Sequence, residues 1–253
     1  MVTGVSATFR FYEELNTFLP PARRKCAFDA VCAHASTTKH MIEALGVPHT
    51  EVELVLVNGE SVGFERRLED GDRVAVYPRL EALDITPLLR VRARALRTSR
   101  FIADVHLGGL AHLLRMAGFD TLYDNHAEDS VIAAISAAQG RIVLTRDREL
   151  LKRSNVTHGC YVHALKSALQ LKEIFWRTGL AGSARPFTLC LHCNAPLRPV
   201  DKALVEHRLP PKVRAHCQRF STCDLCQRVF WEGSHWRSMQ ALLAGLMAGN
   251  GGR

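Results

Sequence analysis

Strand-like and helix-like segments alternate between residues 100 and 178, and this alternation most restricts the fold that the chain can adopt. Short apolar runs such as "RFIAD" and "RIVLTRD" are typical of buried strands, and helical patterns such as "HLGGLAHLLRMAGF" separate them. Strands separated by roughly 10–15 helical residues indicate right-handed βαβ units. We therefore predict an α/β domain with a parallel sheet.

Acidic residues follow three of these strands. Asp104 ends the first strand, Asp124 ends the second, and Asp147 ends the third, while Glu128 and Asp129 open the helix after the second. Ligands of open α/β sheets bind outside the carboxyl ends of parallel strands, which share one edge. We therefore expect Asp104, Asp129 and Asp147 to face one crevice, with Glu128 or Asp124 as a fourth member.

Carboxylates that share a crevice repel one another unless a cation lies between them. All-oxygen sites suit Mg²⁺ or Mn²⁺, and such an ion can polarise a phosphoryl oxygen and activate water. The pattern therefore predicts hydrolysis of a phosphodiester. The alternative is that Asp104, Asp129 and Asp147 each only cap a helix. His106 and Ser130 are further candidates, and their alternatives are a surface position and a helix cap.

Two C-x-x-C pairs lie further along the chain. Cys190 and Cys193 are separated from Cys223 and Cys226 by 29 residues, which we expect to form a loop. Two such knuckles supply four thiolates for tetrahedral Zn²⁺, and four sulfur ligands leave no open position, so the zinc would be structural. Two disulfides or unliganded thiols are the alternatives. Rival ligands are Cys217, His192 and His216, and the residues expected to be plainly buried are Cys26, Cys32 and Cys160.

The first 81 residues have the pattern of a small α+β domain. A strand is expected over 6–12 and a helix from Ser36 or Thr37 to Gly46. The pair Asn58-Gly59 favours a two-residue hairpin turn, and Asp70-Gly71 precedes another strand. A hairpin, further strands and one helix indicate a sheet packed on a helix.

Charge divides the chain unevenly. Residues 1–81 hold nine Lys/Arg and twelve Asp/Glu, a net charge of −3, whereas residues 82–253 hold 24 and 13, a net charge of +11. The basic part suits a polyanion. Residues 82–100 carry five arginines, Arg94 and Arg97 among them, which form either a solvated linker or a strip that contacts phosphates. Basic and aromatic residues around the second C-x-x-C either grip single-stranded RNA or form a small core.

No apolar run approaches the roughly 18 residues of a membrane span, and the first residues lack a signal-peptide pattern. We therefore expect a protein of the cytoplasm, without membrane contact, whose cysteines are reduced.

The stretches "LVNGESV" and "LEDGDRVAVYP" resemble the ubiquitin-like β-grasp sulfur carriers. Those carriers end in an exposed Gly-Gly, whereas this domain continues into "RLEALDITPLL", so a binding or scaffolding role is expected instead. The stretches "FIADVHLGGLAHLLRMAGFDTLYDN" and "RIVLTRDRELLKR" resemble the Mut-seven C-terminal RNase domain, a PIN-like nuclease family, over about residues 99–235. In members of that family, a β-grasp domain is known to precede the RNase domain along the chain.

The resemblance implies metal-dependent RNA cleavage with Asp104, Asp129 and Asp147 as metal-binding acids. Glu128-Asp129 stands where family members often have Asp-Asp, and Gly109 and His112 stand where basic residues are common. Three arginines near the acids are candidates for phosphate contacts: Arg115, Arg146 and Arg148.

We expect five segments: a β-grasp domain at 1–81, an Arg-rich linker at 82–98, a PIN-like RNase domain at 99–185, a zinc ribbon at 186–235, and a helix with a tail at 236–253. The predicted function is endonucleolytic, metal-dependent hydrolysis of RNA, of which tRNA and other structured or single-stranded RNAs are candidates. The alternative is a non-catalytic RNA-binding or adaptor protein whose β-grasp domain recruits a partner protein. A third hypothesis is a protein partner in sulfur-carrier metabolism.

Overall fold

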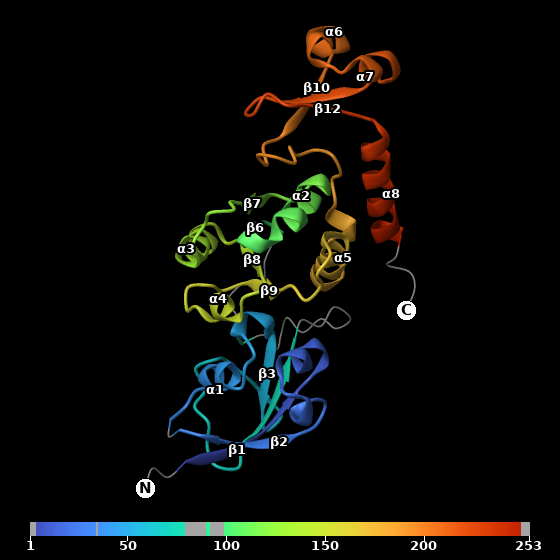
Figure 1. Cartoon of the computed structure of the whole chain (residues 1–253). Helices are drawn as coiled ribbons and strands as arrows, with labels where there is room; N and C mark the ends of the chain where they lie inside the picture. The colour runs from blue at the N-terminus through green and yellow to red at the C-terminus, as the bar shows by residue number, and fades with distance from the viewer. Residues whose placement is uncertain (1–3, 34, 79–89, 92–98, 249–253) are drawn as a thin grey trace. The chain divides into compact units, whose positions relative to one another are not determined.

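The computed structural model describes residues 4–33, 35–78, 90–91 and 99–248 (Figure 1). These residues form two compact units. The first combines the described part of Met1–Thr98 with Asp129–Tyr161, and the second combines Ser99–Glu128 with the described part of Val162–Arg253.

The N-terminal domain is a five-stranded mixed sheet in the order β2-β1-β5-β3-β4. Its elements are β1 (Val5–Phe11), β2 (Phe28–Cys32), α1 (Thr38–Ala44), β3 (Leu54–Val57), β4 (Glu60–Val62) and β5 (Arg73–Tyr77), with the 3₁₀ helices η1 (Glu13–Phe18), η2 (Pro21–Arg23) and η3 (His49–Glu51). The first and last strands pair in parallel and the other pairs are antiparallel. This topology confirms the predicted β-grasp fold.

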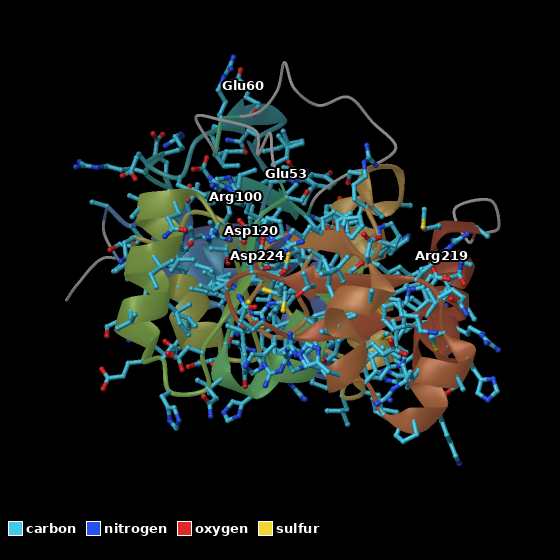
Figure 2. All side chains as sticks on the ribbon, turned by 90° about the horizontal axis from the view of Figure 1, so that it is seen from above. Glu53, Glu60, Arg100, Asp120, Arg219 and Asp224 are labelled. Atoms are coloured by element: carbon cyan, nitrogen blue, oxygen red, sulfur yellow. The ribbon has the colours of Figure 1, made fainter. Side chains whose placement is uncertain are left out.

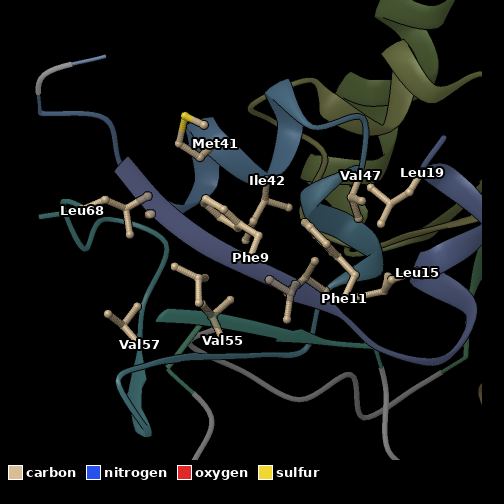
Figure 3. Packing of buried hydrophobic residues seen from close by; sticks show 14 of the residues in the cluster. Phe9, Phe11, Leu15, Leu19, Met41, Ile42, Val47, Val55, Val57 and Leu68 are labelled. Atoms are coloured by element: carbon tan, nitrogen blue, oxygen red, sulfur yellow. The ribbon is translucent and has the colours of Figure 1, made fainter. Parts of the chain in front are cut away.

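Local sequence explains these elements. Thr37 caps α1 by accepting a hydrogen bond from the backbone N–H of His40 at 3.2 Å. Asn58 and Gly59 have φ angles of 52° and 90°, as a two-residue hairpin turn between β3 and β4 requires. Alternate residues of β1 face the core, where Phe9 and Phe11 pack on Ile42 (Figure 3). The predicted strand, helix and turn are therefore confirmed.

Residues 99–185 contain a parallel sheet in the order β7-β6-β8-β9. Its strands are β6 (Phe101–Ala103), β7 (Thr121–Tyr123), β8 (Ile142–Thr145) and β9 (Gly159–Tyr161); its helices are η5 (Val105–Leu107), α2 (Gly108–Met116), α3 (Asp129–Gln139), α4 (Arg148–Lys152), α5 (Ser167–Thr178) and η6 (Ala181–Ser183). β6 and β8 are the two inner strands, and every residue of both is buried. Inner parallel strands are covered on both faces, which explains their unbroken apolar runs. The α/β prediction is confirmed.

The β-grasp domain packs on α4 and β9 within the first unit. The Nε2–H of His49 donates to the carbonyl of Val156 at 2.9 Å, and the Glu51 carboxylate accepts from the backbone N–H of Tyr161. The rings of Phe18 and Tyr161 meet edge to face, with centroids 5.4 Å apart. The 3₁₀ helices η1 and η3 therefore supply most of these contacts.

The C-terminal residues hold a three-stranded antiparallel sheet in the order β10-β11-β12. Its strands are β10 (Leu197–Val200), β11 (Phe220–Cys223) and β12 (Val229–Trp231); the helices are α6 (Lys202–Val205), η7 (Glu206–Arg208), α7 (Pro211–His216) and α8 (Ser234–Ala248). We expected a loop between the two C-x-x-C pairs. The structure corrects this, because Val205 and Leu209 pack on Phe220 and give the segment its own small core.

Candidate functional site

Asp104 follows β6 directly and is buried, with 5% of its surface exposed. Its Oδ1 accepts a hydrogen bond from the backbone N–H of Val105 at 2.5 Å, at the start of η5. A buried carboxylate is costly unless hydrogen bonds or a cation compensate for its lost hydration. Asp104 therefore has the geometry of a helix cap, but it is more buried than a cap at the protein surface.

Asp124 follows β7, the strand that pairs in parallel with β6. Because Ala103 pairs with Tyr123, the residues that follow them, Asp104 and Asp124, leave their strands at the same edge. Asp124 is exposed, and its Oδ1 accepts from the backbone N–H of His126 at 2.9 Å, which closes a local turn. Glu128 is exposed as well. The second unit thus carries one buried and two exposed acids after adjacent strands.

Asp147 lies two residues after β8 and is partly buried. Its backbone N–H donates to Thr145 Oγ1 at 2.9 Å, and its Oδ1 caps α4 by accepting from the N–H of Glu149 at 2.8 Å. Asp129 is the first residue of α3 and is also partly buried. The first unit therefore holds these two acids at helix N-termini. His106 and Ser130 are exposed.

The candidate acids belong to both units: Asp104, Asp124 and Glu128 to the second, and Asp129 and Asp147 to the first. Among the described residues, one group of three or more His, Cys, Asp or Glu side chains has its ligand atoms within 4.8 Å of one another, and it consists of Cys190, Cys193, Cys223 and Cys226. Carboxylate oxygens are nevertheless the donors that Mg²⁺ and Mn²⁺ prefer. The residue types fit a hard cation, and their joint ligation belongs to the proposal below.

Arg115 corrects an expectation. We expected this residue on α2 to contact RNA phosphates, but it is only 3% exposed. Its Nε–H donates to the carbonyl of Thr121 at 2.9 Å, and its Nη1 donates to the carbonyls of Leu191 and His192 at 3.0 and 2.7 Å. A buried guanidinium with three carbonyl partners braces the protein and is not available to a substrate.

Arg148 is a second correction. Its guanidinium lies over the rings of Phe18 and Tyr161, 5.1 and 5.7 Å from their centroids, and donates to the carbonyl of Phe18 at 3.3 Å. Arg148 therefore joins α4 to the β-grasp domain. Arg146 is exposed, as a phosphate contact requires, whereas Arg94 and Arg97 lie outside the described residues.

The four cysteines of the C-x-x-C pairs converge. The sulfurs of Cys190 and Cys226 are 3.6 Å apart, and those of Cys193 and Cys223 are 3.3 Å apart. In a tetrahedral Zn²⁺ site, each sulfur lies at the Zn–S bond distance from the ion, and any two sulfurs are then about 3.8 Å apart. The rival ligand Cys217 lies outside the group, with its thiol near the carbonyl of Glu232. The arrangement fits a tetrahedral four-sulfur metal site.

Each C-x-x-C sequence forms a tight turn that places its two cysteine sulfurs on the same side of the backbone. The N–H of Asn194 donates to the carbonyl of Cys190 at 2.9 Å, and the N–H of Gln227 donates to that of Cys223 at 2.8 Å. Asn194 and Gln227 have φ angles of 67° and 58°, so each turn ends in the left-handed region. The two knuckles are therefore alike, as the matching spacing of their cysteines predicts.

The sulfur environment is uneven. Burial raises the pKa of the Cys190 thiol to about 12. Burial also acts to raise the pKa of Cys226, but the backbone N–H of Arg228 and the neighbouring thiol of Cys190 lower it to about 7. A thiolate thus forms more readily at Cys226 than at Cys190, and a bound cation deprotonates the thiols that coordinate it.

Sequence reasoning missed the residues that tie the first knuckle to the sheet. The Asn194 amide donates from Nδ2 to Asp120 Oδ1 at 2.6 Å, and its Oδ1 accepts from the N–H of Thr121 at 3.0 Å. Together with Arg115, these bonds fasten the knuckle to the start of β7. An asparagine directly after the C-x-x-C is the one signal that could have pointed to them.

The other cysteines are outside any metal group in the described chain. Cys32 is buried, Cys160 is partly buried and Cys26 is exposed, so the expected burial is wrong for Cys26.

Comparisons with known proteins agree with the architecture. In the part of the chain that the structure describes, no helix has both the length and the hydropathy to cross a membrane. No curated protein and no solved structure matched the chain. Residues 4–84 match the family described as Mut7-C ubiquitin, and residues 99–243 match the Mut7-C RNAse domain. Because the second match covers more than half of the 253 residues, the chain belongs to the Mut7-C RNase domain family, preceded by the family's ubiquitin-like domain.

Proposed function

We propose that this protein is a metal-dependent endoribonuclease that hydrolyses RNA phosphodiester bonds with acids from the carboxyl edge of its parallel sheet. The observation that carries the proposal is the parallel pair of β6 and β7, whose carboxyl ends bring Asp104 and Asp124 out at the same edge. Ligands of open α/β sheets bind outside the carboxyl ends of parallel strands.

Asp104 follows β6 in the second unit, and Asp147 follows β8 in the first unit, each after the carboxyl end of its strand. In the proposal they hold a divalent cation, Mg²⁺ or Mn²⁺, together with Asp129 and with Glu128 or Asp124. When bound, such a cation supplies Lewis acidity and activates water for attack on phosphorus. The burial of Asp104 supports its role, because a cation compensates for the hydration that the carboxylate loses.

Of the three candidate arginines Arg115, Arg146 and Arg148, Arg146 remains suited to contact substrate. It is exposed and adjoins Asp147, so its fork of N–H donors can hold a phosphate oxygen near the acids. Arg94 and Arg97 stay candidates for the same task on the grounds of the sequence alone.

The four-cysteine group is proposed to hold structural Zn²⁺. The sulfur spacing fits a tetrahedron, and four sulfur ligands leave no position for substrate. Thiols that must remain reduced favour a reducing compartment, and for this reason we place the protein in the cytoplasm.

A second candidate function is a non-catalytic RNA-binding or adaptor protein. It is favoured by the local bonds of Asp104 and Asp147, since both carboxylates accept backbone N–H groups as caps do. In this alternative the β-grasp domain recruits a partner protein. Its use as a sulfur carrier is not part of either proposal, because its last strand, β5, continues into Pro78 and the rest of the chain rather than into a free Gly-Gly.

Incubation of the full chain with linear and circular RNAs tests the proposal. The reactions contain Mn²⁺, Mg²⁺ or no added divalent ion, and the zinc content is measured in parallel so that loss of Zn²⁺ is not mistaken for loss of the catalytic ion. The proposal predicts metal-dependent cutting of both RNAs. Cutting of the linear RNA alone would make the enzyme an exonuclease, and binding without cutting in any metal would favour the adaptor.

A further inference from the structure

The two faces of the sheet β10-β11-β12 have different surroundings. Phe220 pairs with Trp231 across β11 and β12, and both pack in the small core with Val205 and Leu209. Side chains alternate between faces along a strand, so the next pair, Ser221 and Phe230, points the other way. The core of this sheet is therefore filled without Phe230.

That second face lines a groove of about 670 Å³, within the range of ligand sites. Phe230 and Leu197 contribute from the sheet, Phe187 and Leu189 from the preceding segment, and Trp236 and Met239 from α8. The rings of Phe187 and Trp236 are tilted by 33° with centroids 5.0 Å apart. Phe187, Phe230 and Trp236 are all partly exposed. The groove thus presents aromatic faces that no core residue covers fully.

The segment that carries these rings is basic. Residues 185–237 carry nine Lys/Arg and four Asp/Glu, a net charge of +5. Arg219, labelled in Figure 2, lines the groove with a side chain that is 82% exposed. Its Nη1 lies 3.5 Å from the Glu232 carboxylate. His235 is exposed at the same groove. Aromatic faces within a basic surface complement a polyanion that carries planar rings.

We propose that this groove binds the bases of a single-stranded segment of RNA, with Trp236 and Phe230 as stacking platforms and Arg219 as a phosphate contact. Stacking on aromatic rings tolerates any base, and the basic surface follows the backbone. The assignment of RNA as the ligand rests on the proposed function, whereas the groove itself does not. Substrate would then be selected for unpaired nucleotides at a place distinct from the acids that cut it.

Binding without cleavage tests this inference. The full, zinc-loaded chain is titrated into fluorescein-labelled oligouridine and into a blunt RNA duplex, without added Mg²⁺ or Mn²⁺, and anisotropy is read. Trp236→Ala and Phe230→Ala should each weaken binding to oligouridine by about 5- to 150-fold, the range expected for one stacked base. Trp236→Phe, which keeps a ring, should retain most of the affinity.

A matched control is Trp176→Ala, since Trp176 is 63% exposed on α5 and does not line the groove. Its affinity should equal that of the wild type. Arg219→Gln should reduce the slope of log affinity against log salt concentration by about one, as the loss of one phosphate contact predicts. Oligouridine should quench tryptophan fluorescence in the wild type and quench it much less in Trp236→Phe.

Equal affinity of wild type, Trp236→Ala and Phe230→Ala, with zinc content unchanged, would overturn the inference. So would a wild type that binds no oligouridine, or groove variants that lose self-association instead of RNA binding. Because no step requires cleavage, a chain that binds through the groove and never cuts RNA would sink the proposed function alone.

Discussion

Two arginines that look alike in the sequence join the RNase region to different neighbours, and they do so with different strength. Arg115 fastens the first cysteine knuckle to the start of β7, and Arg148 fastens α4 to the β-grasp domain. Arg115 is 3% exposed and donates three hydrogen bonds of 3.0 Å or less. Arg148 is partly exposed, donates one bond of 3.3 Å and lies over two rings.

The difference indicates how the two neighbours are attached. The knuckle is part of the RNase fold, because the buried guanidinium of Arg115 donates to carbonyls of the knuckle and of Thr121, and the Asn194 side-chain oxygen accepts from the N–H of Thr121. The β-grasp domain is held by the more exposed contact of Arg148 together with the buried His49 and Glu51, which bond to Val156 and Tyr161. Loss of Arg148 alone should therefore open its junction less than loss of Arg115 opens the knuckle.

The largest effect is expected from the metal ligands. Cys223→Ser removes one of four sulfurs, and since the binding energy of structural Zn²⁺ is folding energy, the module should lose its metal and more than about 4 kcal/mol of stability. Zinc analysis and thermal unfolding measure this. Cys26→Ser is the control, because Cys26 is exposed and outside the cysteine group. A Cys223→Ser protein that unfolds like the control would contradict the structural role of the metal.

Arg115→Met should follow, with a loss of roughly 2–4 kcal/mol, because three carbonyls lose their donor in a buried place. Denaturant unfolding of the variant and the wild type measures this loss of unfolding free energy. Arg146→Met, an exposed arginine in the same region, should stay within about 0.5 kcal/mol of the wild type. If the two variants were equally stable, the brace between knuckle and sheet would be refuted.

Arg148→Ala should cost about 1–2 kcal/mol, the value of one long hydrogen bond and a half-buried cation–π contact. The effect should appear as faster amide exchange in η1 and β9, while the cysteine module is unchanged. Arg153→Ala, at an exposed position after α4, serves as the control. Exchange that increases at the cysteine module instead would reverse the comparison of the two junctions.

The smallest effect concerns Glu173, which lies at neither junction. Burial acts to raise its pKa, but hydrogen bonds from the side chain and N–H of His163 and from the N–H of Ala164 lower it below 4.5. A carboxyl with a depressed folded-state pKa stabilises the fold above its unfolded pKa, and that contribution is lost as pH falls through the folded pKa.

Stability of the wild type should therefore decline below about pH 4.5 more steeply than that of Glu173→Gln. Urea unfolding at pH 7 and at successively lower pH measures the two slopes. Parallel slopes would show that Glu173 does not contribute.

The sequence predicted the secondary structure of the backbone better than it predicted which residues the side chains contact. Strands β6 and β8 followed from unbroken apolar runs, and the hairpin followed from Asn58-Gly59, because these are local effects of burial and of backbone conformation. The partners of Arg115 and Arg148 are 77 and 130 residues away for their longest-range bonds, and no local pattern encodes such distances. The helices between the C-x-x-C pairs were missed because α6 and α7 are only 4 and 6 residues long, too short for a periodic signal.

The acids show the same limit. Their position after the strands was readable, yet a strand-end aspartate that binds a metal and one that caps a helix have the same sequence pattern. Asparagine separates the two roles, because it caps a helix about as well as aspartate but carries no charge for a cation.

The most direct test of the central claim is therefore the Mn²⁺-dependent rate of RNA cleavage by Asp104→Asn and Asp147→Asn, measured beside Glu149→Gln. Glu149 is an exposed acid on α4 that pairs with Lys152. We predict that both asparagine variants lose at least about a hundredfold in rate while their stability stays within about 1 kcal/mol of the wild type, and that Glu149→Gln keeps full activity. Asparagine variants that cut RNA as fast as the wild type would show that the acids are caps and that the catalytic site lies elsewhere.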